Sequence, residues 1–171
     1  MKILVTLTEE ELETAALGGV RRRINGIKNG RRSTHPETPD HKQNWWQSDI
    51  IGAIGEFAVA KALGETWRPT VGKVDQRDVR EFEVRTTEQP TPLLRYRGHN
   101  DPSAKYILCS YRGNQVLIQG WLTGITVRSL GYEEYDNVWT AGVDQLYSMC
   151  DLNCEIQWSD TVKPYGQYSK R

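Results

Sequence analysis

Four residues have types and spacing that could support catalysis: Glu56, Asp78, Glu83 and Arg85. The first of them, Glu56, lies on a predicted helix. On the predicted helix around it, the residues three, four and seven positions away on the same face are Gly52, Val59, Ala60 and Leu63. A carboxylate on this small, apolar face is expected to be partly buried. Burial of a carboxylate costs free energy unless it has a cation, a metal or a chemical role. The alternative is an exposed Glu56 on a helix rotated differently.

The other two acidic positions are Asp78 and Glu83, the latter on a predicted strand at 81–87. Side chains alternate along a strand, so Glu83 and Arg85 share its charged face while the apolar residues face the core. A solvated sheet face is the alternative interpretation. Together with Glu56, these residues form an oxygen-rich set that suits Mg²⁺ or Mn²⁺ and phosphodiester hydrolysis.

The spacing of Asp78 and Glu83 requires a break in the strand. Residues five apart in an unbroken strand face opposite sides of the sheet. We therefore expect a turn or bulge near Arg80 to bring the two carboxylates together, with Asp75 as the alternative acidic residue.

A basic run precedes these residues, with six cations and no anion between Thr14 and His35. Its members are Arg21, Arg22, Arg23, Lys28, Arg31 and Arg32. We expect this run to bind DNA phosphates, since local potential rather than total charge steers a polyanion. A solvated face that complements the helix dipole is the equal alternative.

Other polar residues have weaker functional signals. His35 and His41 lie in a predicted exposed loop at 33–44, where no partner stands at zinc-site spacing. In the segment 93–101, two arginines and Tyr96 could contact a nucleic-acid backbone and base, with His99 and Asp101 as auxiliary site residues. A solvated hairpin end explains that segment equally well.

The elements that must position these residues follow from capping and periodicity. Thr8 and Glu11 form a predicted capping box at the start of the first helix. The predicted elements are a short strand at 1–8, helices over 9 to about 28 and 49–64, strands at 82–87, 106–111 and 115–127, a hairpin turn at 112–114 and a short helix at 145–149. We expect a less regular tail at 130–171, loosely held from 158 onward.

Length and composition bound the class of protein. The 171 residues are consistent with one α/β domain, and 22 basic residues balance 22 acidic ones. No stretch approaches the roughly 18 apolar residues of a membrane-spanning helix, and no signal peptide is evident. Three cysteines are too few for a secreted disulfide framework, so we expect a cytoplasmic protein without a membrane partner.

The chain resembles the PD-(D/E)XK nuclease superfamily, whose core runs helix, three strands, helix, strand, in the order of the expected elements. The superfamily has an acidic residue in the first helix, an Asp near the second strand and acidic-x-Lys on the third. Glu56, Asp78 and Glu83-Val84-Arg85 stand in those places. The stretches 51–64 and 83–87 with Gly120-Trp121 also resemble uncharacterised phage and prophage proteins.

The resemblance implies a PD-(D/E)XK-like core at about 49–127 within a single nuclease-like domain over 1–171. A mixed β-sheet flanked by helices would follow an extra N-terminal strand and a basic helix at 9–28. The superfamily's lysine is replaced by Arg85, which stays protonated and cannot act as a base but can stabilise charge on a phosphate. Lys61 or Lys73 could supply a relocated ammonium, and Arg77 stands where a proline would precede Asp78.

We therefore expect a Mg²⁺-dependent (or Mn²⁺-dependent) endo- or exodeoxyribonuclease of phage or mobile-element origin, working in the host cytoplasm. Asp78 and Glu83 would bind the metal, Glu56 would orient a metal ligand or water, and Arg85 would stabilise the charged phosphorus centre. The alternative is an inactive nuclease-fold protein that binds nucleic acid or inhibits a host enzyme. A phage structural or assembly protein is a third interpretation.

Overall fold

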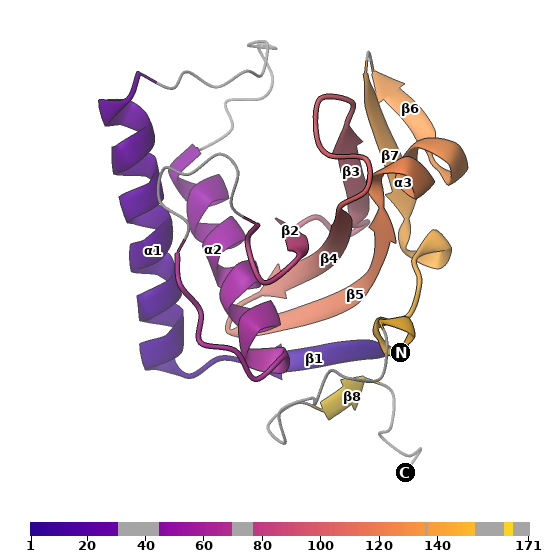
Figure 1. Ribbon diagram of the computed structural model, residues 1–171. Helices are drawn as coiled ribbons and strands as arrows, with labels where there is room; N and C mark the ends of the chain where they lie inside the picture. Colours follow the sequence, from indigo (N-terminus) through magenta and orange to yellow (C-terminus); the bar gives the residue numbers. More distant parts are fainter. Residues whose placement is uncertain (31–44, 70–76, 136, 153–162, 166–171) are drawn as a thin grey trace.

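The computed structural model describes residues 1–30, 45–69, 77–135, 137–152 and 163–165. Its elements in chain order are β1 (Lys2–Thr6), α1 (Glu9–Lys28), α2 (Trp45–Ala62), β2 (Phe82–Thr87), β3 (Leu93–Arg97), β4 (Lys105–Arg112), β5 (Gln115–Thr123), α3 (Gly124–Leu130), β6 (Tyr132–Tyr135), β7 (Val138–Gly142) and β8 (Lys163–Tyr165) (Figure 1). Two 3₁₀ turns lie at Val143–Gln145 and Met149–Asp151. No helix among the described residues has the length and apolar character to cross a bilayer.

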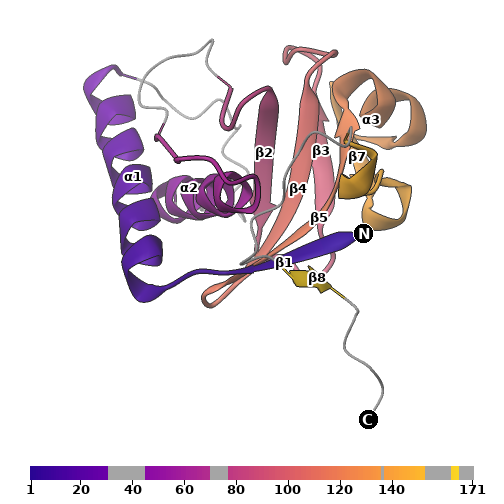
Figure 2. The same ribbon diagram turned by 60° about the horizontal axis from the view of Figure 1, so that its bottom comes forward.

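The main sheet has the strand order β2-β4-β5-β1-β8. It is mixed, because β2 and β4 run parallel while the other neighbours run antiparallel. Helix α2 lies between this sheet and α1, so α1 forms an outer layer (Figure 2). The predicted α/β class, with a mixed sheet and flanking helices, is confirmed. The N-terminal strand β1 is part of the main sheet, between β5 and β8.

A second sheet, with the order β3-β7-β6, packs with α3 against the opposite face of β4 and β5. The described chain has four strands between α2 and α3 rather than the three of the expected order. The additional strand, β3, belongs to the second sheet. Two buried clusters result, one under α2 and one under the second sheet. Strand β4 contributes to both, with Cys109 buried on the α2 side and Leu108 on the other.

Strand β5 changes which side chains face which cluster. Its register with β4 shifts opposite Leu108 and Cys109, where Gln119 is the extra residue. Before this bulge Ile118 packs on the α2 side, and after it Leu122 packs on the side of the second sheet. The inserted residue shifts the alternation of side chains by one position, so residues before and after the bulge face different hydrophobic clusters.

Three boundaries of predicted elements need comment. The capping box at Thr8 is confirmed, and α1 begins at Glu9 as expected. The strand expected over 115–127 is wrong beyond Thr123, because the hydroxyl of Thr123 accepts a hydrogen bond from the Thr126 N–H and begins α3. The helix expected at 145–149 is also wrong, because the backbone of Tyr147 pairs with Trp121 of β5.

The tail is described only in part. Strand β8 pairs with β1, which fixes 163–165 at the edge of the main sheet. The rest of the segment that we expected to be loosely held, 158–162 and 166–171, lies outside the described residues.

Candidate functional site

A tight turn carries Asp78 back beside β2. The N–H of Phe82 donates to the carbonyl oxygen of Val79 at 2.8 Å, and the Asp78 N–H donates to the carbonyl oxygen of Phe82 at 3.1 Å. Arg80 adopts a left-handed conformation with φ of 50°. The Asp78 carboxylate then accepts a hydrogen bond from the Val84 N–H at 2.9 Å, which places it between Glu83 and Arg85. The predicted turn near Arg80 is therefore confirmed.

Glu83 lies between two arginines. Its Oε1 accepts a hydrogen bond from Arg77 Nη1 at 3.2 Å, and its Oε2 accepts one from Arg85 Nη2 at 3.3 Å. Arg85 also lies 3.8 Å from Asp78 Oδ2, and its guanidinium stands 5.2 Å from the centre of the Tyr106 ring. These contacts hold Arg85 beside both carboxylates and Arg77 beside Glu83.

Glu56 is buried, at 2% exposure, and its carboxylate pairs with Arg22 of α1. The two guanidinium nitrogens of Arg22 donate to the two carboxylate oxygens at 2.8 and 2.7 Å. Burial opposes the positive charge on Arg22, but the hydrogen bonds and charge of Glu56 outweigh it and raise the Arg22 pKa. Gly52 lies beside this contact, and a Cβ there would stand 3.7 Å from Arg22 Nη1, at ordinary van der Waals distance. The expected burial of Glu56 is confirmed.

Asp78 is the electrostatic centre of this cluster. Burial and the negative charges of Glu56 and Glu83 raise its pKa to about 7, against the opposing effects of the Val84 N–H and of Arg85. The charge on Asp78 also contributes to the raised pKa of Arg22. Carboxylates from α2, the turn and β2 are thus close enough to influence one another. We call Glu56, Asp78 and Glu83 with Arg22, Arg77 and Arg85 the acid–arginine cluster.

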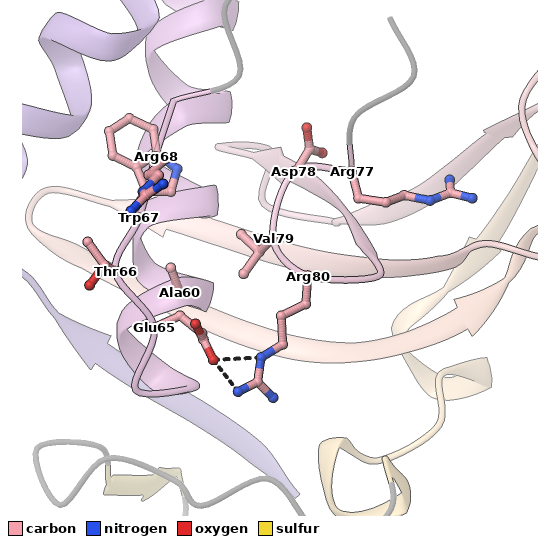
Figure 3. Close-up of a pocket in the computed structure, with 9 residues that line it drawn as sticks. All are labelled: Ala60, Glu65, Thr66, Trp67, Arg68, Arg77, Asp78, Val79 and Arg80. Carbon is pink, nitrogen blue, oxygen red and sulfur yellow. Dashed lines mark hydrogen bonds and ion pairs between the residues drawn. The ribbon is translucent and has the colours of Figure 1, made fainter. Parts of the chain in front are cut away.

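A pocket of about 250 Å³ opens beside the cluster. It is lined by Ala60, Glu65, Thr66, Trp67, Arg68, Arg77, Asp78, Val79 and Arg80. Figure 3 shows Arg80 turned toward Glu65, whereas the side chains of Arg77 and Asp78 point away from that pair. Trp67 packs on Phe57, with ring centres 5.5 Å apart, so its ring forms part of the wall.

The carboxylates of the cluster suit a Mg²⁺ site with two protein ligands but not a site with three. Among the described residues, no three Asp, Glu, His or Cys side chains are grouped to hold a metal ion. Mg²⁺, however, is commonly bound through one or two carboxylates, with water and substrate phosphate completing its shell. Asp78 and Glu83 provide two such carboxylates, while both oxygens of Glu56 contact Arg22. Asp75, the alternative acidic residue, lies outside the described residues.

The basic run of α1 divides into inward and outward side chains. Arg22 pairs with Glu56, and Arg23 Nε lies 2.6 Å from the carboxylate of Asp49 on α2. These two arginines therefore connect α1 to α2, a role that the sequence did not predict. Arg21 and Lys28 are exposed, whereas Arg31 and Arg32 lie outside the described residues.

The remaining candidates are distributed around the cluster. Asp101 pairs with Arg77 and so joins its edge, while His99 is exposed. Lys61 donates to Glu11 at 2.6 Å and to the carbonyl oxygen of Thr6 at 3.1 Å, so its ammonium is held at α1 and β1. The candidates Lys73, His35 and His41 lie outside the described residues.

Sequence reasoning missed Arg22, Arg77 and Tyr106 as neighbours of the predicted residues. Arg22 had a partial signal, because a buried Glu56 requires a cationic partner, although its position in the sequence does not say which cation. Arg77 also had one, because it directly precedes Asp78 and the predicted turn near Arg80 brings both toward Glu83. Tyr106 had none, since its position depends on the pairing of β4 with β2.

Comparisons of the chain with models of known protein families, with curated proteins and with solved structures found no match.

Proposed function

We propose that the acid–arginine cluster is the active site of a Mg²⁺-dependent (or Mn²⁺-dependent) DNA nuclease with a PD-(D/E)XK-like core. The observation that carries this proposal is the convergence on Asp78 of Glu56 from a helix and of Glu83 and Arg85 from one strand. A half-buried carboxyl whose pKa is raised by two further carboxylates is a feature that clusters at functional sites. Electrostatic repulsion among them favours a cation, and the neighbouring arginines favour a phosphate.

Each residue then has a distinct role. Asp78 and Glu83 would hold the metal ion, which would polarise the phosphate and lower the pKa of bound water. Arg85 donates hydrogen bonds to a non-bridging phosphate oxygen and stabilises the charge that develops there, but stays protonated throughout. Arg77 holds an adjacent phosphate oxygen at the rim. Glu56 acts as a positioning residue, because its carboxylate orients the guanidinium of Arg22.

The second candidate is a nuclease-fold protein that binds nucleic acid without cutting it. The contacts that favour it are those of Arg22 with both oxygens of Glu56 and of Arg77 and Arg85 with Glu83. Carboxylates neutralised in this way have less need of a metal ion. The arginine side chains would then serve only to bind phosphate.

The two candidates are separated by cleavage of supercoiled, linear and branched DNA with Mg²⁺ or Mn²⁺. We expect the wild type to cleave, Glu83→Ala to lose cleavage, and Arg85→Ala to lose about 10²–10³ in rate, as for one lost oxyanion donor. Arg85→Lys should retain substantial cleavage, because an ammonium there still stabilises charge. Glu81→Gln is the matched control, since Glu81 precedes β2 and pairs with Lys105 at 3.6 Å, outside the cluster.

Metal binding gives a second readout. Calorimetric titration with Mn²⁺ should show binding to the wild type and to Glu81→Gln, and loss of binding in Asp78→Asn and Glu83→Ala. Absence of cleavage and of Mn²⁺ binding in the wild type, with DNA binding retained, would establish the second candidate instead.

A further inference from the structure

The outer face of α1 carries exposed aliphatic side chains. Leu17 is 48% exposed, Ile24 41% and Ile27 59%, and Val20 beside them is half-buried. At about 100° per residue, these four side chains project from one side of the helix. The opposite side buries Ala15, Gly18 and Gly19 against the rest of the protein. We call Leu17, Val20, Ile24 and Ile27 the α1 stripe.

Helix α1 is the outermost layer of the fold on this side. Figures 1 and 2 show α2 between α1 and the main sheet in both views. The α1 stripe therefore points away from the hydrophobic core. Single exposed aliphatic residues are common on protein surfaces, but a row of them along one helix face is typical of an interaction surface.

The charges at the two ends of the stripe have opposite signs. Glu10 and Glu13 are exposed before it, and Arg21 and Lys28 are exposed along its second half. Glu13 stands four residues before Leu17, and Lys28 stands four residues after Ile24. The outer face is therefore acidic at its beginning, aliphatic in the middle and basic at its end.

This pattern is complementary to itself when two copies of the helix run antiparallel. With Leu17 opposite Ile24 of a second copy, Glu13 stands opposite Lys28, and the same contacts recur on the other side of the two-fold axis. The helix dipoles also oppose one another in this arrangement. A parallel arrangement would instead place Glu13 opposite Glu13 and Lys28 opposite Lys28, which is repulsive.

We propose that α1 is the contact surface between two copies of this chain, packed antiparallel about a two-fold axis that passes between Val20 and Arg21. The outer face provides the contact, and the inner face, with Arg22, continues to hold Glu56. The two acid–arginine clusters of a dimer thus lie on opposite sides of the paired helices. The contact does not depend on nuclease activity, since it uses none of the cluster residues.

The expected affinity is modest. One face of a 20-residue helix is about 30 Å long, and the interface it makes is at the small end of those that hold stable complexes. We therefore expect a weak dimer, with a dissociation constant in roughly the micromolar range. The oligomeric state should therefore change with protein concentration.

Sedimentation velocity of the full chain over about 10 to 500 µM, which brackets that range, tests the proposal. We expect a monomer–dimer equilibrium in the wild type and a monomer at all concentrations in Leu17→Glu. Ile125→Glu is the matched control, because Ile125 is 62% exposed on α3 and should leave the equilibrium unchanged. The melting temperature and circular dichroism of each variant show whether its fold is intact.

Charge exchange tests the antiparallel arrangement. Glu13→Lys and Lys28→Glu should each weaken the dimer several-fold, and the double variant should restore it, because the exchanged charges again face each other. A wild type that stays monomeric overturns the proposal, as does a dimer that Ile125→Glu disrupts and Leu17→Glu does not. A double variant no stronger than either single variant overturns the antiparallel arrangement.

Discussion

The charged residues of the cluster alternate in sign over short distances. Glu56 pairs with Arg22 through two hydrogen bonds, and Glu83 contacts both Arg77 and Arg85. Asp78 is the carboxyl whose charge is least compensated, because burial and two neighbouring carboxylates together outweigh Arg85 and raise its pKa. At the residue scale, the protonation of Asp78 therefore controls the charge of the cluster near neutral pH.

This raised pKa predicts a pH-dependent stability in the metal-free protein. Asp78 has a pKa of about 7 in the folded state, against 3.8 for the ordinary carboxyl group. The folded state therefore binds the proton more tightly, and this contribution to stability is full below about pH 4 and lost as the pH rises through 7. Asp78→Asn removes the titration while its amide oxygen can still accept from Val84 N–H.

Thermal melts in EDTA between pH 4 and 8.5 measure the effect. One pKa unit corresponds to about 1.4 kcal/mol, and 1 kcal/mol moves the melting temperature of a domain of this size by about 2–4 °C. We expect Asp78→Asn to melt at least about 4 °C above the wild type at pH 8.5. The gap should close toward pH 4. A constant difference at all pH values would contradict the raised pKa.

At the scale of elements, the approach of α2 to β2 decides where Glu56 stands relative to Glu83. Gly55 allows this approach, because a Cβ at that position would overlap Oγ1 of Thr86 on β2. Gly52 lies on the same helix, but its added Cβ would meet only Arg22 Nη1 at 3.7 Å, an ordinary contact. Two glycines one turn apart therefore differ in what they permit.

Alanine substitution tests this difference. Gly55→Ala should destabilise the protein by about 1–3 kcal/mol, because the helix must move off the strand. Gly52→Ala is the matched control, and the helix propensity of alanine should make it neutral or stabilising by up to about 1 kcal/mol. Urea denaturation measures both. Equal effects at the two positions would show that Gly55 does not set the distance between α2 and β2.

Local signals in the sequence predicted some elements well and others poorly. The capping box at Thr8 and the turn near Arg80 were predicted correctly, because each depends on residues only a few positions apart. The predicted end of β5 was wrong, because β-branched residues continue past Thr123 in the sequence. The strand ends where its pairing with β4 ends and the Thr123 side chain caps α3. The partner of Glu56 lies 34 residues away on α1, beyond the reach of local patterns.

At the scale of the whole molecule, the formal net charge is zero, with 22 basic and 22 acidic residues. Any attraction for DNA must therefore come from the local field of arginines such as Arg77 and Arg85. All four arginines are paired with carboxylates, but Arg22 and Arg23 add less to that field, because their side chains are 23% and 16% exposed, against 33% and 34% for Arg77 and Arg85. DNA affinity should thus depend on few phosphate contacts and fall with salt accordingly.

Salt titration of DNA binding tests this field. If Arg77 contacts one phosphate, Arg77→Gln should reduce the slope of log affinity against log salt by about 0.9 in magnitude. Arg112→Gln is the control, since Arg112 is exposed beside the β4–β5 hairpin turn and away from the pocket. Fluorescence anisotropy with a short duplex, without divalent metal, measures both slopes. An unchanged slope for Arg77→Gln would remove Arg77 from the DNA contact.

The buried position of Cys109 makes its thiol a probe of local opening of the fold. Its thiol is buried between β4 and α2, and burial raises its pKa, so it is neither accessible nor ionised in the closed fold. In a variant with Cys150→Ser and Cys154→Ser, we expect an alkylating reagent to reach Cys109 when local opening separates α2 from the sheet. Because Glu56 lies on α2 and Glu83 on β2, that opening would also separate these two residues. The alkylation rate would therefore measure how often the acid–arginine cluster opens.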